Sequence, residues 1–254
     1  MVNRNAFKGL DIAMMIHPGV IDMAVFYSLA CHNFDAEFFG KASHAASAPE
    51  AGINALEALI LAYNAVNSLR QHIRSNERIH GIITDGGEAA NIVPAHSAAN
   101  FIVRAENDNH LEKLKERFLN CFTGAAAATG ARLEYEWDEN YYAAMNNNMT
   151  AAKLYADNMS NLGRTVIVPD PGRPSGSTDM GNVSQVVPSI HPFVSIAPKG
   201  TSLHSVEFAE AANSEAGIKG MLDASKALAM TVIDLLANPE TMGKIKKEFS
   251  EHND

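Results

Sequence analysis

The stretch SAANFIVRAENDNHLEKLKERFLNCFTGAAAATGARLEYEW, residues 97–137, decides the fold of the middle of this chain. It opens with the apolar alternation of a half-buried strand. A helical repeat follows over about 111–128 and stops at Gly130, a suitable C-cap, and a second alternating strand closes the stretch. The residues expected to face inward are Ala99, Phe101, Val103 and Ala105 in the first strand and Leu111, Leu114, Phe118 and Phe122 in the helix.

The same patterns extend this unit upstream. A strand is expected within 27–40, a helix from about residue 54, and a short strand over 78–84. The apolar stripe of that helix would be Leu56, Leu59, Ile60, Tyr63, Val66, Leu69 and Ile73. The resulting order β-α-β-β-α-β is the ferredoxin-like arrangement. We therefore expect an independent α+β domain over residues 28–145.

An α/β domain is expected on both sides of this insertion, in residues 1–27 and 146–254. The apolar run 12–16 indicates a buried parallel strand that ends at His17-Pro18-Gly19, which places His17 at its tip. Further strands are expected at 165–168, 185–187 and 192–197, helices at 150–162 and 215–236, and loops over 169–182 and 200–208. The last helix would bury Met221, Leu222, Leu228, Ala229, Val232, Ile233 and Leu236, and the charged tail 244–254 would be frayed.

The composition excludes several classes of protein. The chain has 254 residues, is 46% hydrophobic and 19% charged, and carries a formal charge of −9. These are globular proportions, and an acidic chain without a basic cluster does not suit nucleic acid or an anionic membrane. No apolar stretch is long enough to span a bilayer. Only two cysteines, Cys31 and Cys121, are present, which predicts a reduced, cytoplasmic protein.

Three histidines lie where chemistry is possible. His17, beside Pro18-Gly19, and His204, in a polar loop before the last helix, could meet across the carboxyl edge of the sheet and bind a metal. His44 lies in a loop of small residues and could donate a hydrogen bond to a developing oxyanion. Taken one at a time, His17 and His204 are better explained as surface histidines in a turn and in a solvated loop. The alternative for His44 is a histidine without a partner just before a helix.

Four further residues carry weaker signals. Asn91 precedes Ile-Val-Pro, and Arg104 lies in an apolar strand, where it needs an internal acid or an acidic substrate as its partner. Asp179 caps a helix, its more common role, or shapes a pocket rim, and His191, between Ile190 and Pro192, is interpreted as a buried structural residue. We assign no functional role to Asp179 or to His191.

Taken together, the segments resemble the M20 family of metallopeptidases and amidohydrolases, in particular the branch of aminoacylase-1-like dipeptidases and aminobenzoyl-glutamate hydrolases. The matching stretches span nearly the whole chain in the family's order. They are MMIHPG (14–19), FFGKASHAASAPEAGINALEALILAYN (38–64), RIHGIITDGGEAANIVP (78–94), PSGSTDMGNVSQVVPSIHPF (174–193), EFAEAANSEAG (207–217) and KALAMTVIDLL (226–236).

The resemblance implies an α/β catalytic domain, like that of zinc peptidases, interrupted by a ferredoxin-like lid that forms a homodimer. His17 and His204 match metal ligands, for which zinc, manganese or cobalt are suitable. His44 matches a lid histidine that polarises the scissile carbonyl, often in the partner subunit's site. Asn91 and Arg104 match lid positions associated with substrate contact. The implied reaction is hydrolysis of an amide bond to an amino acid, in a dipeptide or an N-acyl-amino acid.

One departure from the family pattern changes the prediction. The family's first metal ligands and the Glu-Glu pair that supplies its catalytic base belong upstream of MMIHPG, and this chain has no Glu-Glu pair. A catalytic metal needs about three protein ligands, and its water needs a general base. We therefore expect the C-terminal portion of an amidohydrolase, inactive alone and completed by an N-terminal fragment. The alternatives are a non-catalytic dimerisation or binding module and a truncated remnant.

Overall fold

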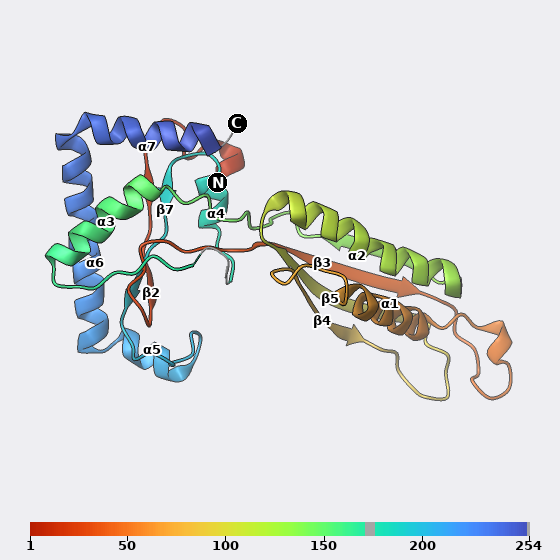
Figure 1. Cartoon of the computed structure of the whole chain (residues 1–254). Helices are drawn as coiled ribbons and strands as arrows, with labels where there is room; N and C mark the ends of the chain where they lie inside the picture. The colour runs from red at the N-terminus through yellow and green to blue at the C-terminus, as the bar shows by residue number, and fades with distance from the viewer. Residues whose placement is uncertain (171–175, 253–254) are drawn as a thin grey trace. The chain divides into compact units, whose positions relative to one another are not determined.

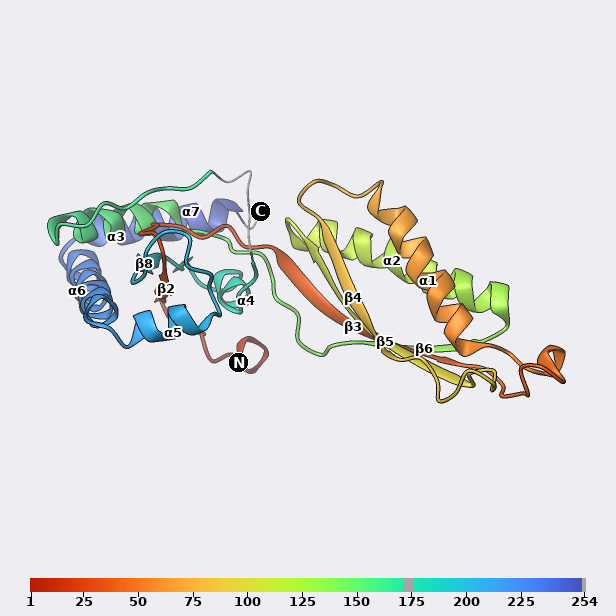
Figure 2. The ribbon, with the colours of Figure 1, turned by 90° about the horizontal axis from the view of Figure 1, so that it is seen from below.

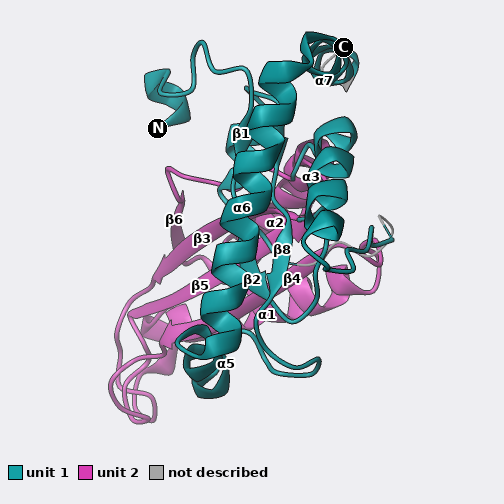
Figure 3. Ribbon diagram, turned by 90° about the vertical axis from the view of Figure 1, so that its left-hand side faces the viewer, with its two compact units in different colours: residues 1–28, 145–254 teal, residues 29–144 magenta. Residues whose placement is uncertain are grey.

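The computed structural model describes residues 1–170 and 176–252, and the chain divides into two compact units (Figure 1). Unit 1 combines residues 1–28 with residues 145–254, and unit 2 comprises residues 29–144 (Figure 3). Unit 1 is therefore discontinuous in sequence, with unit 2 inserted between its two parts. The α/β class with an inserted α+β unit, expected from the sequence, is confirmed.

Unit 2 contains a four-stranded antiparallel sheet in the order β4-β5-β3-β6. Its strands are β3 (Ala30–Phe39), β4 (Arg78–Asp85), β5 (His96–Ala105) and β6 (Arg132–Trp137). The two long strands pair in register from Ala30 with Ala105 to Phe39 with His96. In β5 every second residue is buried, as the alternation predicts, and these residues form the core with the two helices. Together with α1 and α2, this strand order is the ferredoxin-like topology.

Two helices cover one face of this sheet, α1 (Ala55–Arg70) and α2 (Asp108–Thr129) (Figure 2). Their N-caps are asparagines, Asn54 and Asn107, whose side chains accept hydrogen bonds from Glu57 N and His110 N. Gly130 ends α2 in a left-handed conformation, φ 75°, as predicted. A short 3₁₀ helix, η2 (Pro49–Ala51), precedes α1.

The buried face of α1 agrees with much of the predicted stripe, since Leu59 and Val66 are fully buried and Tyr63, Leu69 and Ile73 pack against the core. However, Ile60 is 36% exposed, and alanines form much of the rest of the buried face. The buried residues of α1 are Ala55, Ala58, Leu59, Ala62 and Val66. Small side chains let α1 lie close to α2 and the sheet, so tight packing rather than side-chain size decides which face is buried.

The strands of unit 1 are short and parallel. They are β1 (Ala13–Met14) with β7 (Ser189–Ile190), and β2 (His17–Gly19) with β8 (Phe193–Ser195). The single buried strand expected over 12–16 is therefore wrong: two short strands form, and the run is only partly buried, with Met15 36% exposed. The second strand begins at His17 and includes Pro18, because proline is tolerated on a strand edge that needs no N–H. On the other side of β8, Met23 bridges Phe193 and also Ile167.

The helices of unit 1 are η1 (Val2–Arg4), α3 (Met149–Asn161), α4 (Met180–Ser184), α5 (Val206–Ala212), α6 (Glu215–Ala237) and α7 (Pro239–His252). Helices α3, α6 and α7 pack around a core that includes Tyr155, Met159, Ile190 and Ile245. A largely buried ion-pair cluster joins segments far apart in sequence, because Arg164 contacts both Asp22 (3.1 Å) and Asp223 (2.9 Å).

Several predicted elements of unit 1 are wrong. Residues 165–168 contain a single bridge, at Ile167, and residues 185–187 form a turn after α4 instead of a strand. The predicted loop over 169–182 includes 171–175, which lie outside the described residues, and ends in α4. The loop over 200–208 ends in α5, whose N-cap Ser205 accepts a hydrogen bond from Phe208 N.

The predicted buried face of α6 is also wrong. Met221, Leu222, Val232, Ile233 and Leu236 are 43–79% exposed. The residues buried in α6 are mostly small or polar: Gly217, Gly220, Asp223, Ala224, Ala227, Thr231 and Leu235. Within the described residues, α6 therefore presents most of its large apolar side chains to solvent, whereas Leu235 is buried.

The charged tail does not fray within the described residues but forms α7. Ile245 is fully buried. The Glu248 carboxylate accepts hydrogen bonds from Met149 N (2.5 Å) and Thr150 N (3.0 Å), at the start of α3. The tail is helical because the buried Ile245 and the hydrogen-bonded Glu248 hold it against the rest of unit 1. The charged composition of the tail does not reveal these contacts. Residues 253–254 lie outside the described part of the chain.

Candidate functional site

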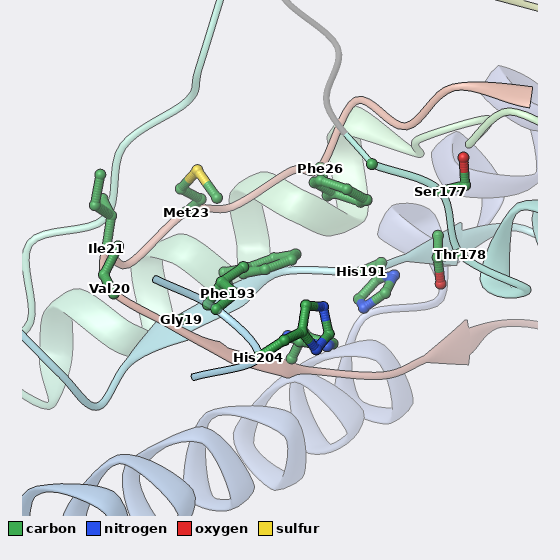
Figure 4. Close-up of a pocket in the computed structure, with 13 residues that line it drawn as sticks. Gly19, Val20, Ile21, Met23, Phe26, Ser177, Thr178, His191, Phe193 and His204 are labelled. Atoms are coloured by element: carbon green, nitrogen blue, oxygen red, sulfur yellow. The ribbon is translucent and has the colours of Figure 1, made fainter. Parts of the chain in front are cut away.

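A cavity of about 360 Å³ lies in unit 1 and collects most of the predicted site residues of that unit (Figure 4). Its lining comes from the end of β2, the segment after it, β8 and the loop before α5. The lining residues are His17, Gly19, Val20, Ile21, Met23, Phe26, Gly176, Ser177, Thr178, His191, Phe193, Leu203 and His204. Three histidines therefore share one largely apolar cavity, which is the usual composition of a ligand site.

His17 is held in one tautomer by its own backbone neighbourhood. Its Nδ1 lies 2.7 Å from the carbonyl oxygen of Pro18. A carbonyl only accepts, so Nδ1 carries the proton and the lone pair of the neutral ring is on Nε2. The ring also stacks on Phe193 at 4.8 Å. A fixed ring whose Nε2 keeps its lone pair is the usual form of a metal-binding histidine.

His204 reaches the same cavity from an unusual backbone conformation. Its φ is 65°, one of two positive values among the non-glycine residues that the structure describes. The next residue, Ser205, is the N-cap of α5 and fixes the chain just after this turn. A left-handed non-glycine residue in a cavity wall is typical of a functional position.

His191 forms part of the cavity wall and is 1% exposed. Neither Nδ1 nor Nε2 has a hydrogen-bond partner among the described residues. Burial, and secondarily the nearby His17, lower the pKa of His191 to about 4, so the ring is neutral near pH 7. Its ring centroid lies 5.8 Å from that of His17. No functional role could be assigned to this residue from the sequence, because its orphaned nitrogens cannot be read from the letters.

His44 lies in unit 2, on a loop whose base is closed by backbone pairing. The backbones of Lys41 and Ile53 exchange two hydrogen bonds. The loop also pairs with a second segment, because Ala45 N donates to the carbonyl oxygen of Asn91 at 3.0 Å. His44 Nδ1 accepts hydrogen bonds from Ala46 N (3.2 Å) and Ser47 N (3.3 Å). Because Nδ1 accepts, the proton of the neutral ring is on Nε2. The outer nitrogen of His44 is therefore a donor, as an oxyanion-stabilising residue requires.

Asn91 and Arg104 are not brought together within unit 2. Asn91 lies beside the His44 loop, near the end of the sheet where β5 begins at His96. Arg104 is eight residues further along β5, about 26 Å away at the usual rise of a strand. In the neighbouring strand Arg104 is paired with Arg78, which places two guanidinium groups on one face. The Arg78 guanidinium donates to the carbonyl oxygens of Ser75 and Glu77 in the preceding loop.

Sequence reasoning missed His96, which lies between two carboxylates. Its Nε2 is 2.7 Å from Glu37 and its Nδ1 is 2.7 Å from Asp85. Hydrogen bonds to Glu37, the larger cause, and to Asp85 raise the pKa of His96 above its ordinary value. The three residues come from β3, β4 and β5, so no local spacing in the sequence could have indicated this cluster.

Asp179 does not cap α4, although it occupies the N-cap position. Its side chain makes no capping hydrogen bond; Met180 N donates to Thr178 Oγ1 instead.

Across the described ranges 1–170 and 176–252, no group of three or more His, Cys, Asp or Glu side chains is arranged to hold a metal ion. In the same ranges, no helix combines the length and the apolar character needed to cross a bilayer.

Comparison with known proteins identifies relatives for both units. Residues 31–129 match the peptidase dimerisation domain of the M20 peptidases. The chain is 38% identical over 251 residues to the Xaa-Arg dipeptidase of Mus musculus, covering 98% of this chain and 58% of that protein. It is 23% identical over 310 residues to one of the p-aminobenzoyl-glutamate hydrolase chains of Escherichia coli, covering 100% of this chain and 64% of that protein. The chain thus spans less than two thirds of these relatives.

Solved structures share the fold. The aminobenzoyl-glutamate utilization protein of Klebsiella pneumoniae superposes with a TM-score of 0.67 at 20% identity, covering 92% of this chain and 57% of that one. A putative aminohydrolase from methicillin-resistant Staphylococcus aureus gives a TM-score of 0.69 at 17% identity, over 90% of this chain and 61% of that one. Both units therefore adopt folds seen in these proteins.

Proposed function

This chain is a homologue of the M20 peptidases and amidohydrolases, and on that premise we propose that it forms the C-terminal portion of an enzyme that hydrolyses an amide bond to an amino acid. The observation that carries the proposal is the convergence of His17 and His204 on one cavity. The substrate class is a dipeptide or an N-acyl-amino acid. Because a relative is a dipeptidase acting on Xaa-Arg, a dipeptide that ends in arginine is the first substrate to test.

The two imidazoles fit part of a divalent metal site, for zinc, manganese or cobalt. His17 presents the lone pair of Nε2, and His204 lines the same cavity. A metal bound in such a site supplies a nucleophilic water and polarises the substrate carbonyl. A firmly held catalytic metal takes about three protein ligands, so we propose that this chain provides two of them and that a complementing polypeptide provides the rest.

The surface of unit 1 supports a complementing polypeptide. Helix α6 exposes a row of large apolar side chains, and a groove of about 320 Å³ lies between them and the strands, lined in part by Ile16, Pro18, Met221 and Leu228. On the strand segment 13–19, the N–H groups of Ala13, Met15 and His17 all donate toward the β7–β8 side. In the described residues the opposite edge of this segment pairs with no strand, so it can receive one.

In the reaction, the residues of this chain would bind, orient and polarise the substrate. His44 Nε2–H would donate a hydrogen bond to the carbonyl oxygen as negative charge develops on it. Arg104, beside Arg78, would hold a substrate carboxylate, and Asn91 would contact the substrate near His44. His44 and Asn91 lie at the opposite end of the sheet from Arg104. One small substrate could therefore contact both groups only if one copy of the chain supplied His44 and Asn91 and a second copy supplied Arg104. A homodimer through unit 2 supplies that arrangement.

The test is reconstitution of activity. The chain would be purified alone and together with a polypeptide that carries the upstream part of an M20 catalytic domain. Alanyl-arginine and N-acetyl-amino acids would be assayed with zinc, manganese or cobalt. We expect turnover only in the mixture. His17→Ala or His204→Ala should abolish it, and His44→Ala should lower kcat about 100-fold or more.

The matched control is His72→Ala, which removes an exposed histidine of unit 2 that lies outside the strands carrying Arg78 and Arg104. It should retain wild-type kcat and KM. Turnover by the chain alone would contradict the need for a complementing polypeptide. Turnover in the mixture that survives both His17→Ala and His204→Ala would contradict the proposed ligands. Absence of turnover in every mixture would favour a non-catalytic binding or dimerisation module.

A further inference from the structure

His191 is unusual among the buried polar residues of unit 1. Its side chain is 1% exposed, and both ring nitrogens lack a hydrogen-bond partner among the described residues. The ring is oriented by aromatic packing instead, since it stacks on Phe193 (5.7 Å, 27°) and meets the edge of Phe26 (5.7 Å, 69°). A buried donor or acceptor left without a partner costs about 1–3 kcal/mol, so a native protein rarely keeps two without a use for them.

The position of His191 indicates that use. It forms part of the wall of the same cavity as His17 and His204 (Figure 4). No acidic residue is among the described residues that line this cavity, so no carboxylate of the lining is available to the His191 nitrogens. A neutral imidazole offers one N–H donor and one acceptor nitrogen. Its N–H can donate to an amide carbonyl oxygen, or its other nitrogen can accept from an amide N–H.

We infer that His191 is a substrate-binding residue that hydrogen-bonds an uncharged amide or acyl group of the substrate in the cavity of unit 1. This inference rests on the proposed function and adds the residue that orients the bound molecule there. It also gives His191 a role different from those of its neighbours. His17 and His204 would bind metal, whereas His191, held between Phe26 and Phe193, would bind the organic part of the substrate.

The alternative occupant of the His191 nitrogens is the metal itself. His17 and His191 have ring centroids 5.8 Å apart, so a third imidazole is near the proposed ligands. The side chains as placed do not form a group of three metal-binding residues within the described ranges. Metal ligation by His191 is therefore an outcome that would overturn the inference.

The test uses the full chain with isotope-labelled histidine rings, followed by nuclear magnetic resonance. Zinc is added first and alanyl-arginine second, and His17→Ala, His191→Phe and His204→Ala assign the ring signals. We expect zinc to shift the His17 and His204 signals, and the dipeptide to shift the His191 signal. His191→Phe keeps the aromatic packing and removes both nitrogens. It should weaken dipeptide binding about tenfold and change zinc affinity less than twofold.

Thermal unfolding separates binding from structure. His191→Phe should leave the unfolding midpoint unchanged or raise it, because two unpaired buried polar atoms are replaced by carbon. The control His72→Phe alters an exposed histidine of unit 2 and should change neither binding nor stability. A structural role for His191 would instead lower the midpoint and leave dipeptide binding unchanged.

Each other outcome is decisive. If zinc shifts the His191 signal together with those of His17 and His204, then His191 is a metal ligand and the inference is wrong. If the dipeptide binds His191→Phe as tightly as the wild type, the inference fails while the proposed function stands. If the dipeptide shifts none of the three signals, the proposed substrate class fails, and the role of His191 fails with it.

Discussion

At the scale of single residues, backbone contacts assign opposite chemistry to two histidines. His17 donates from Nδ1 to a carbonyl oxygen, which leaves a lone pair on Nε2. His44 accepts at Nδ1 from two backbone N–H groups, which leaves a donor at Nε2. The first form suits a metal and the second suits an oxyanion. The sequence indicated both residues as candidates, but the tautomers follow from neighbours that only the folded chain supplies.

The His96 cluster gives a pH-dependent prediction. Because Glu37 and Asp85 raise the pKa of His96, its imidazole should titrate above 6.5 in the folded chain. The stabilising contact is then fully present below about pH 6.5, the ordinary pKa of histidine, and is lost as the pH rises through the raised folded value. A nuclear magnetic resonance titration of the ring measures this directly.

Single variants of the two carboxylates test the cause of the shift. Glu37→Gln should lower the His96 pKa more than Asp85→Asn, since the Glu37 hydrogen bond is the larger cause. The pKa of Asp85 is lowered from its ordinary value. The chief cause is the hydrogen bond that its carboxylate accepts from Gly87 N–H, and the next is its hydrogen bond with His96. A His96 pKa at or below 6.5 in the unmodified chain would show that the imidazole is not held between the carboxylates of Glu37 and Asp85.

At the scale of elements, the loop that carries His44 depends on a close backbone approach at Gly40. A Cβ at Gly40 would lie 2.1 Å from the carbonyl oxygen of Ile53, which pairs with Lys41 at the base of the loop. Gly40→Ala must therefore force the two backbone segments apart. We expect a loss of about 1–3 kcal/mol in the free energy of unfolding, measured by urea denaturation.

The matched control is Gly124→Ala in the interior of α2. A Cβ there meets nothing within 4 Å. This variant should be neutral or more stable by about 0.5–1 kcal/mol, because alanine favours the helix. If Gly40→Ala were as stable as Gly124→Ala, the close approach at the base of the His44 loop would be disproved.

Helix α7 gives a second prediction at this scale. Ile245→Ala should destabilise unit 1 by about 2–5 kcal/mol, because a fully buried side chain leaves a cavity. Glu248→Ala should cost about 0.5–2 kcal/mol through the lost cap on α3. Glu251→Ala removes an exposed carboxylate of the same helix and should stay within about 0.5 kcal/mol of the wild type. Equal effects of Glu248→Ala and Glu251→Ala would show that the cap is not formed.

At the scale of the whole molecule, the proposed homodimer needs a surface on unit 2. Strand β4 is one edge of the sheet, and exposed apolar side chains lie on it and on α1. They are Ile82 (63% exposed), Ile83 (42%), Ile60 (36%) and Leu61 (41%). An open edge flanked by apolar residues favours pairing with a second copy.

Charge on that edge should break the dimer. Ile83→Lys should shift the chain toward the monomer in light scattering at micromolar concentration, because it places a charge in the apolar contact. Tyr135→Lys is the matched control on β6, the opposite edge of the sheet, where the side chain is 48% exposed. It should leave the dimer intact. A monomeric unmodified chain, or a dimer disrupted only by Tyr135→Lys, would contradict the proposed interface.

Sequence patterns were sufficient to predict the order of helices and strands in unit 2. The alternation in β5, the apolar repeat of α2 and the cap at Gly130 are local patterns in the sequence. They predict these elements because, in a natural sequence, local preferences agree with the overall fold. The same patterns placed the approximate bounds of α3 and α6 in unit 1 and singled out His17, His44 and His204 as candidates.

Tertiary structure alone decided which faces are buried and which side chains meet. In α6 the buried residues are mostly small and most large apolar ones are exposed, because burial depends on what packs against a helix as well as on its own period. Helix α7 forms because Ile245 and Glu248 find partners at the start of α3, which are 97 and 99 residues away in the chain. His96 and His191 acquire their properties in the same way, from side chains brought together by strands that are distant in sequence.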